Sequence, residues 1–271
     1  MSEKKVEMSQ AMKEKLAPKS FIKNPIKGTK YTIMVSSAKG GVGKSTFAVN
    51  LAFALKQLGK KVGLLDADIY GPSLPKLIGK NEKPENKDGK YIVPIVSHGV
   101  QCMSMGFLVE ETTPMIWRGP MVISAIKTLT ERVLWKDLDI IVIDMPPGTG
   151  DTQLTFAQDI KVDGAIIIST PQDIALLDVK RGIQMFDKTK INIFGLVDNM
   201  SFFKGDDGKK YSIFGEGGVE KTAKEFNKDF LGKIPLHQDL RLSADKGVPL
   251  TLSDTKHEIS LIFNEIAEKI L

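Results

Sequence analysis

Short runs of apolar, mostly β-branched residues recur along the chain and alternate with segments of helical periodicity. Continuous apolar runs are typical of strands that are buried on both faces, and hence of a parallel sheet. The runs are Ile33–Val35, Val62–Leu65, Ile140–Ile143, Ala165–Ile168, Ile191–Val197 and a shorter one that ends at Ile234. This alternation predicts an α/β fold: a doubly wound, mostly parallel sheet flanked by helices, with its ligand at the carboxyl ends of the strands.

Two amphipathic patterns predict helices that pack on this sheet. Their apolar positions are Phe47, Leu51, Ala54, Leu55 and Leu58 in the first, and Ile259, Ile262, Phe263, Ile266 and Ile270 in the second. Residues 80–105 interrupt the alternation and predict a small β excursion, and residues 203–212 predict a polar hairpin or a mobile loop. We expect a single domain over residues 26–271, preceded by a basic tail or helix over residues 1–25.

The basic excess of the chain lies near its start. Eight lysines and three acidic residues among residues 1–30 account for the whole formal net charge of +5. The remainder is balanced and offers no basic face, so we expect neither nucleic acid nor a membrane as a partner. A solvated tail is the prediction, and contact of the tail with nucleic acid or a membrane is the alternative.

The single cysteine, Cys102, excludes a disulfide framework within one chain and indicates a reducing compartment. No apolar segment follows the lysines and acids of the N-terminus, which argues against a secretory signal. No run approaches the roughly 18 apolar residues that a membrane span needs. We therefore expect a cytoplasmic protein.

The strongest chemical signal is a glycine-rich loop that follows the apolar run ending at Val35. Residues Lys39–Thr46 read Lys-Gly-Gly-Val-Gly-Lys-Ser-Thr, and a predicted helix begins near Lys44. In such a loop, backbone N–H groups and the helix N-terminus bind phosphate oxygens. Lys44 can reach the β- and γ-phosphates, and the hydroxyl of Ser45 can ligate Mg²⁺. The predicted nucleotide-binding residues of the loop are Lys39, Gly40, Gly41, Val42, Gly43, Lys44, Ser45 and Thr46.

The loop departs from the usual G-x-x-x-x-G-K-[ST] pattern in two ways. Ala38 stands where the first glycine is usual, and Lys39 adds a second lysine. A second cation so near the phosphates has to be used or tolerated, and we count Lys39 among the catalytic candidates together with Lys44.

Three carboxylates follow predicted strands and should face the phosphates. Asp66 and Asp68 end the run after Val62–Leu65, and Asp144 follows Ile140–Ile143. We predict that Asp66 and Asp144 belong to the Mg²⁺ shell, through water, and that Asp68 orients the attacking water. The alternative for Asp68 is a helix N-cap, and spacing alone does not separate the two roles.

Two further residues complete the predicted nucleotide site. Gly148, in the Pro-Pro-Gly-Thr-Gly stretch after Asp144, could offer its N–H to a γ-phosphate and report its presence. Asn199, just after the run Ile191–Val197, could pair with an adenine edge, and a turn-forming asparagine is the competing interpretation.

These residues resemble a known family. The Lys39–Ser45 stretch is similar to the deviant Walker A loop of the MinD/ParA class. Within that class the chain resembles the Mrp (ApbC, Nbp-like) family of iron–sulfur cluster carriers over residues 20–271. The stretches that carry the resemblance are Asp66–Pro75, Trp117–Pro120, Asp144–Asp151, Asn199–Ser201 and Ile213–Gly218. The resemblance implies a slow homodimeric ATPase that uses ATP and Mg²⁺ and serves iron–sulfur client or scaffold proteins. It also implies that Lys39 contacts the nucleotide bound by the partner subunit.

One departure concerns the cluster itself. Where the family commonly has Cys-x-x-Cys, this chain has Lys204-Gly-Asp-Asp-Gly208. Thiolates usually hold such clusters, four in the ordinary case, and a symmetric dimer would offer only two copies of Cys102. Cys102 lies in an apolar run and is a weak candidate ligand. The chain could use other ligands, move clusters with a partner's cysteines, or have kept only the ATPase switch; the sequence leaves these open.

Two functions from different classes share this site. One is an ATPase of iron–sulfur cluster assembly or transfer. The other is a MinD/ParA-like spatial organiser, or a nucleotide-dependent binding switch with negligible turnover. A membrane-binding C-terminal helix should carry a basic polar face. The terminal segment instead bears Glu258, Glu265 and Glu268 beside Lys256 and Lys269, which favours the first function.

Overall fold

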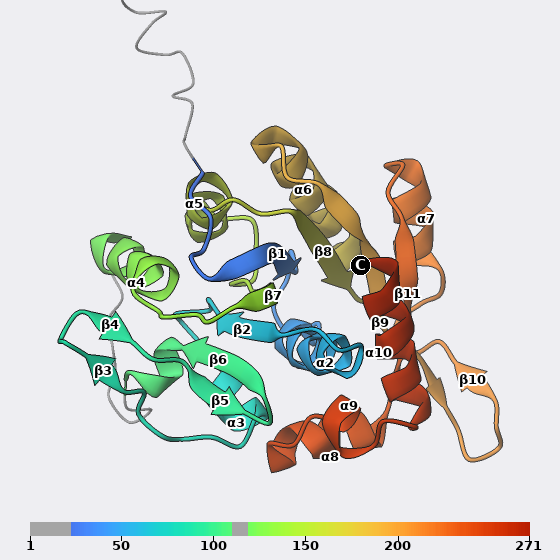
Figure 1. Ribbon diagram of the computed structural model, residues 1–271. Helices are drawn as coiled ribbons and strands as arrows, with labels where there is room; N and C mark the ends of the chain where they lie inside the picture. Colours follow the sequence, from blue (N-terminus) through green and yellow to red (C-terminus); the bar gives the residue numbers. More distant parts are fainter. Residues whose placement is uncertain (1–22, 110–118) are drawn as a thin grey trace, which may run out of the picture.

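The computed structural model describes residues 23–109 and 119–271, and a nine-stranded sheet runs through its centre (Figure 1). The strands of this sheet are β1 (Thr29–Ser36), β2 (Val62–Asp66), β5 (Ile95–Ser97), β6 (Val100–Ser104), β7 (Leu138–Asp144), β8 (Gly164–Ser169), β9 (Ile193–Lys204), β10 (Lys210–Tyr211) and β11 (Phe230–Leu236). Their order is β10-β9-β8-β1-β7-β2-β6-β5, and β11 pairs with β9. All neighbours are parallel except β5 with β6 and β10 with β9, which confirms the predicted mostly parallel sheet.

Helices cover both faces of the sheet. One face carries α2 (Lys44–Gln57), α3 (Leu74–Leu77), α8 (Gln238–Lys246), α9 (Leu250–Ser253) and α10 (Glu258–Lys269). The other face carries α4 (Gly119–Glu131), α5 (Asp151–Asp159), α6 (Asp173–Thr189) and α7 (Gly218–Glu225). A separate apolar core lies under each layer, since successive strand side chains point to opposite faces.

The two predicted helical patterns form as expected. Phe47, Leu51 and Leu55 of α2 are buried, and they lie in the same core as Ile259 and Phe263 of α10. The rings of Phe47 and Phe263 are in contact, with centroids 5.5 Å apart. The two helices therefore pack on each other as well as on the sheet, which joins the end of the chain to the helix that follows the glycine-rich loop.

The two predicted interruptions have different outcomes. Residues 203–212 form the tight hairpin between β9 and β10, in which Phe203 pairs with Tyr211. Residues 80–105 form only in part a separate excursion: β3 (Asn86–Lys87) and β4 (Tyr91–Ile92) pair with each other. However, β6 pairs in parallel with β2 and so belongs to the main sheet, where most of its residues are buried.

The ends of the described segments bear on two predictions. Asn24 forms backbone hydrogen bonds with residues 159 and 161, next to the expected boundary at residue 26, and the division into tail and domain remains a prediction. The predicted tail falls mostly outside the described residues, as do Trp117 and Arg118 of the family-like stretch. A short 3₁₀ turn, Met105–Phe107, precedes that gap. Within the described ranges, no helix has the length and apolar composition needed to cross a bilayer.

The parallel pairing brings three strand ends together. Val35 of β1 and Asp66 of β2 both pair with Asp144 of β7. The loops that leave these strands therefore meet at one edge of the sheet, where the first turn of α2 also begins.

Candidate nucleotide site

The glycine-rich loop lies between β1 and α2, as predicted. Gly41 and Gly43 have φ values of +80° and +85°, a left-handed conformation that favours glycine. Gly43 is the N-cap of α2, and a Cβ there would collide with the amide nitrogen of Asn199. A pocket of about 260 Å³ opens above the loop and is bordered by Ser45 and Asp68. The loop is thus shaped for backbone N–H groups and the start of a helix to face a bound anion.

Lys44 points into this site and is buried, with 6% of its surface exposed. Its ammonium group forms an ion pair with the carboxylate of the buried Asp144 and lies 3.3 Å from the hydroxyl of Ser45. Lys44, a predicted catalytic residue, is therefore in contact with Asp144, a predicted metal residue. A buried ammonium group needs an anionic partner, and in this structure that partner is Asp144. A bound phosphate could replace Asp144 as the partner of Lys44.

The Asp66 carboxylate holds the loops around it. Its Oδ1 accepts a hydrogen bond from the Asp68 N–H (3.0 Å). Its Oδ2 accepts bonds from the N–H groups of Ser73 and Leu74 (3.0 and 3.1 Å) and from the Ser104 hydroxyl (3.0 Å). Three of these four bonds are on Oδ2, so Oδ1 keeps one acceptor position that a magnesium-bound water could use. The predicted metal role of Asp66 remains a prediction.

Burial, with the Asp144 carboxylate as a second cause, raises the pKa of Asp66 to about 7. The N–H groups of Leu74 and Asp68 and the Lys44 charge oppose the rise. At this edge of the sheet, two buried carboxyl groups, those of Asp66 and Asp144, thus lie near one buried ammonium group, that of Lys44, among the described residues. A second cation at the site would favour the ionised form of Asp66.

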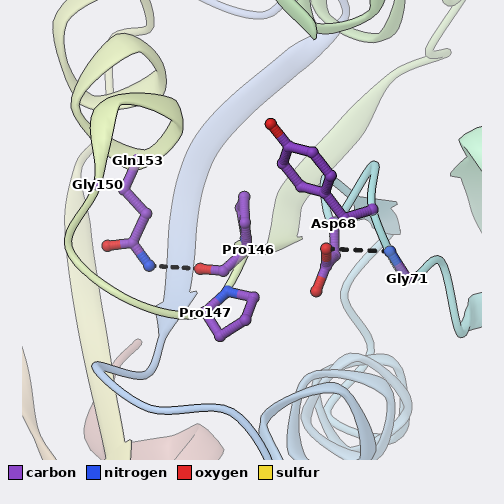
Figure 2. Close-up of a pocket in the computed structure, with 7 residues that line it drawn as sticks. Asp68, Gly71, Pro146, Pro147, Gly150 and Gln153 are labelled. Atoms are coloured by element: carbon purple, nitrogen blue, oxygen red, sulfur yellow. Dashed lines mark hydrogen bonds between the residues drawn. The ribbon is translucent and has the colours of Figure 1, made fainter. Parts of the chain in front are cut away.

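Asp68 borders a second pocket, of about 330 Å³ (Figure 2). Its Oδ1 accepts a hydrogen bond from the Gly71 N–H at 3.3 Å, and Figure 2 shows the carboxylate across the pocket from Pro146 and Pro147. Burial raises the pKa of Asp68. Asp68 does not occupy the N-cap position of α3, which is Ser73. The carboxylate that accepts a hydrogen bond from the first turn of this helix, at the Leu74 N–H, is that of Asp66.

The loop after β7 is tied to the residues before the glycine-rich loop. Gly148, at φ +94°, donates its N–H to the Ser37 carbonyl at 2.9 Å, so contact with a γ-phosphate requires an exchange of partners. The buried Gln153, which the sequence did not reveal, donates to the Pro146 carbonyl and accepts from the Ser36 hydroxyl at 3.4 Å. Ser104 was also missed, although it ends an apolar run in the way that Asp66 does.

The other predicted residues fall into three environments. Asn199 donates from its amide to the Val42 carbonyl at 2.7 Å and so supports the phosphate loop, and its predicted contact with a base remains a prediction. Lys39 is exposed, and its ammonium group has no ion pair with any described residue. Thr46 is half-buried, and its carbonyl accepts a hydrogen bond from Asn50 at 2.8 Å.

Cys102 is buried in β6, within the core beneath α2. Burial raises the pKa of its thiol to about 12, and the sulfur donates only a weak hydrogen bond to the Val100 carbonyl (3.6 Å). A cluster needs an accessible thiolate. The folded chain therefore does not present Cys102 to a cluster.

A loop of this shape, between a strand and a helix of a parallel sheet and facing strand-end carboxylates, defines a nucleotide-binding P-loop NTPase. MinD of Pyrococcus furiosus shares the fold, with a TM-score of 0.64, 21% identity, and 89% of this chain and 98% of that chain covered. A nucleotide-binding protein of Archaeoglobus fulgidus, solved in complex with ADP, is more similar. Its TM-score is 0.74 at 36% identity, over 86% of this chain and 91% of that one.

Residues 28–271 match the family described as ParA, the NUBPL iron-transfer P-loop NTPases, and the chain belongs to this family. An iron–sulfur cluster carrier protein of Escherichia coli is 49% identical over 247 residues, which is 90% of this chain and 67% of that protein. The mouse iron–sulfur cluster transfer protein NUBPL is 48% identical over 250 residues, 91% of this chain and 78% of its own. The resemblance predicted from the motifs is thus confirmed.

Proposed function

We propose that this chain is a homodimeric ATPase that binds and hydrolyses Mg-ATP and acts in iron–sulfur cluster assembly or transfer. The observation that carries the proposal is the buried Lys44–Asp144 ion pair beside Ser45, inside a glycine-rich loop. A lysine held this way is ready to exchange a carboxylate for the β- and γ-phosphates of a nucleotide.

The donor set around the loop fits Mg²⁺. Ser45 and Asp144 offer oxygen ligands, which this ion prefers, and Asp144 becomes free when Lys44 turns to the phosphates. Bound Mg²⁺ would neutralise charge on the phosphate oxygens. Asp66 keeps the Asp68 loop and α3 in position, and Asp68 orients the attacking water from its place between the two pockets. The Gly148 N–H leaves the Ser37 carbonyl for the terminal phosphate.

Lys39 supports the dimeric part of the proposal. It lies on the same loop as Lys44, but its side chain is exposed and has no ion pair among the described residues. A lysine placed this way can reach phosphates bound by a second copy, which would make nucleotide binding and dimer formation depend on each other.

Light scattering with and without Mg-ATP tests this part. The wild type should dimerise only with ATP, and Lys39→Ala should lose the dimer and most turnover while a monomer still binds nucleotide. Lys27→Ala serves as the matched control, because Lys27 is an exposed lysine in the turn before β1, whereas the loop follows the strand. A Lys39→Ala protein that dimerises and turns over normally contradicts the cross-subunit contact.

The iron–sulfur part of the proposal is supported by the names of the relatives. Because Cys102 is buried, we propose that this chain handles clusters with cysteines of a scaffold or client. Anaerobic reconstitution tests this. The wild type alone should retain little iron and sulfide, and Cys102→Ala should retain the same amount. A stable cluster that Cys102→Ala loses would instead identify an autonomous carrier.

A further inference from the structure

Two of the three histidines in the sequence meet outside the nucleotide site. His237 precedes α8 and His257 precedes α10, and their rings lie at right angles with centroids 5.0 Å apart. The short helix α9 contacts both α8 and α10, which keeps the two helix starts together. The side chains are largely sheltered, with 26% and 16% exposed.

A carboxylate lies between the two rings. The Oδ2 of Asp239 is 3.3 Å from Nε2 of His257 and 3.8 Å from Nδ1 of His237. One ligand atom from each residue lies within 4.8 Å of the others. Metal bonds of about 2.0–2.2 Å in a tetrahedral site separate ligand atoms by roughly 3.3–3.6 Å. The three groups are therefore within small side-chain movements of coordinating one ion.

We propose that His237, Asp239 and His257 form a binding site for a divalent first-row transition metal ion such as Zn²⁺ or Co²⁺. Two imidazoles and one carboxylate suit such ions, whereas the nucleotide site offers oxygen ligands that suit Mg²⁺. The site is separate from the proposed ATPase chemistry and does not depend on it.

The hydrogen bonds define how the ion enters. His237 Nδ1 accepts from the Asp239 N–H at 3.2 Å, so this capping bond gives way when the lone pair binds the ion. Its Nε2 faces Glu258 at 3.7 Å, and a carboxylate behind a metal-bound histidine orients the ring. His257 Nδ1 accepts from the Ile259 N–H at 3.1 Å, which places the proton on Nε2. The ion replaces that proton, which moves to Nδ1 of the same ring, and Ile259 loses its cap.

Helix capping explains each histidine separately, but it does not require the two rings and Asp239 to converge. Asparagine separates the two roles, because it caps helices at least as well and lacks the imidazole. His237→Asn and His257→Asn should therefore fold normally and lose only the metal site. His98→Asn is the matched control, since His98 is the remaining histidine and sits in a turn at φ +47°, which asparagine tolerates.

The experiment uses full-length, chelator-stripped protein without a histidine tag or nucleotide, in excess Mg²⁺ to fill oxygen-ligand sites. Co²⁺ should bind at one ion per chain with the strong visible absorption of a tetrahedral site, and Zn²⁺ should displace it. His237→Asn and His257→Asn should each lower Co²⁺ affinity at least tenfold, and His98→Asn should leave it unchanged. A wild type that takes up no more Co²⁺ than the double variant His237→Asn/His257→Asn overturns the proposal.

Imidazole nitrogen resonances of the wild type give a second measurement that requires no variant. Zn²⁺ should shift the signals of His237 and His257 and leave those of His98 in place. It should also speed hydrogen exchange at the Ile259 amide, because its cap is lost. Shifts confined to His98, or none at all, contradict the site.

Discussion

Replacing Lys44 by methionine should strongly destabilise the nucleotide-free protein, quite apart from its effect on ATP. The side chains of Lys44 and Asp144 are only 6% and 5% exposed, and Asp66 pairs with Asp144 across the sheet. Without the ammonium group, Asp144 remains a buried charge beside a second carboxyl. Breaking a buried pair in this way costs about 3–5 kcal/mol. Methionine keeps most of the aliphatic stem, so the loss measures charge rather than packing.

A double-mutant cycle isolates this interaction. Urea unfolding without nucleotide should show Lys44→Met and Asp144→Asn each destabilised, and the double variant should be less destabilised than their sum by about 1–3 kcal/mol. The exposed Lys30–Asp139 pair is the control and should show little coupling. Additivity within about 0.5 kcal/mol at Lys44–Asp144, or an unchanged stability of Lys44→Met, would refute the buried pair.

Three other substitutions separate function from stability. Asp68→Ala should slow ATP turnover while Mg-ATP still binds; a lowered melting temperature with intact turnover per folded molecule would instead assign Asp68 a structural role. Asn199→Ala should destabilise the chain by about 1–3 kcal/mol and weaken ATP binding, because the buried Val42 carbonyl loses its donor; unchanged ATP affinity in calorimetry would contradict this. Asp198 is buried with an oxygen that lacks a hydrogen bond, and burial raises its pKa to about 6 from 3.8. In the folded protein the Asp198 carboxyl therefore stays protonated to a higher pH than it does in the unfolded chain. The stability of the wild type relative to Asp198→Asn should fall by up to about 3 kcal/mol as the pH rises from 4 to 6, and then level off. A difference that is constant with pH would argue against this.

The sequence predicted the parts of this molecule whose signals are local. Apolar runs such as Ile140–Ile143 are buried on both faces wherever they occur, so they identify parallel strands without knowledge of their neighbours. The glycine-rich loop is equally local, because Gly43 has a backbone conformation that few other residues adopt. Strand ends then place Asp66 and Asp144 at one edge, whatever the strand order.

What the sequence did not reveal depends on which segments become neighbours. Val100–Met103 was assigned to a separate excursion, because nothing in the run itself shows that it lies beside β2. The four donors to Asp66 come from three different segments, and Gln153 acts through Pro146 and Ser36, which lie on two others. Such contacts follow from topology, and a single sequence records none of them.

The most direct test of the central claim is phosphate release from Mg-ATP by the tag-free chain, compared with that by Lys44→Met. The account predicts slow, Mg²⁺-dependent release by the wild type and none above background by the variant, at concentrations where both are shown to be folded. Equal release by the two proteins, or none by a wild type that binds ATP, would contradict the proposed ATPase.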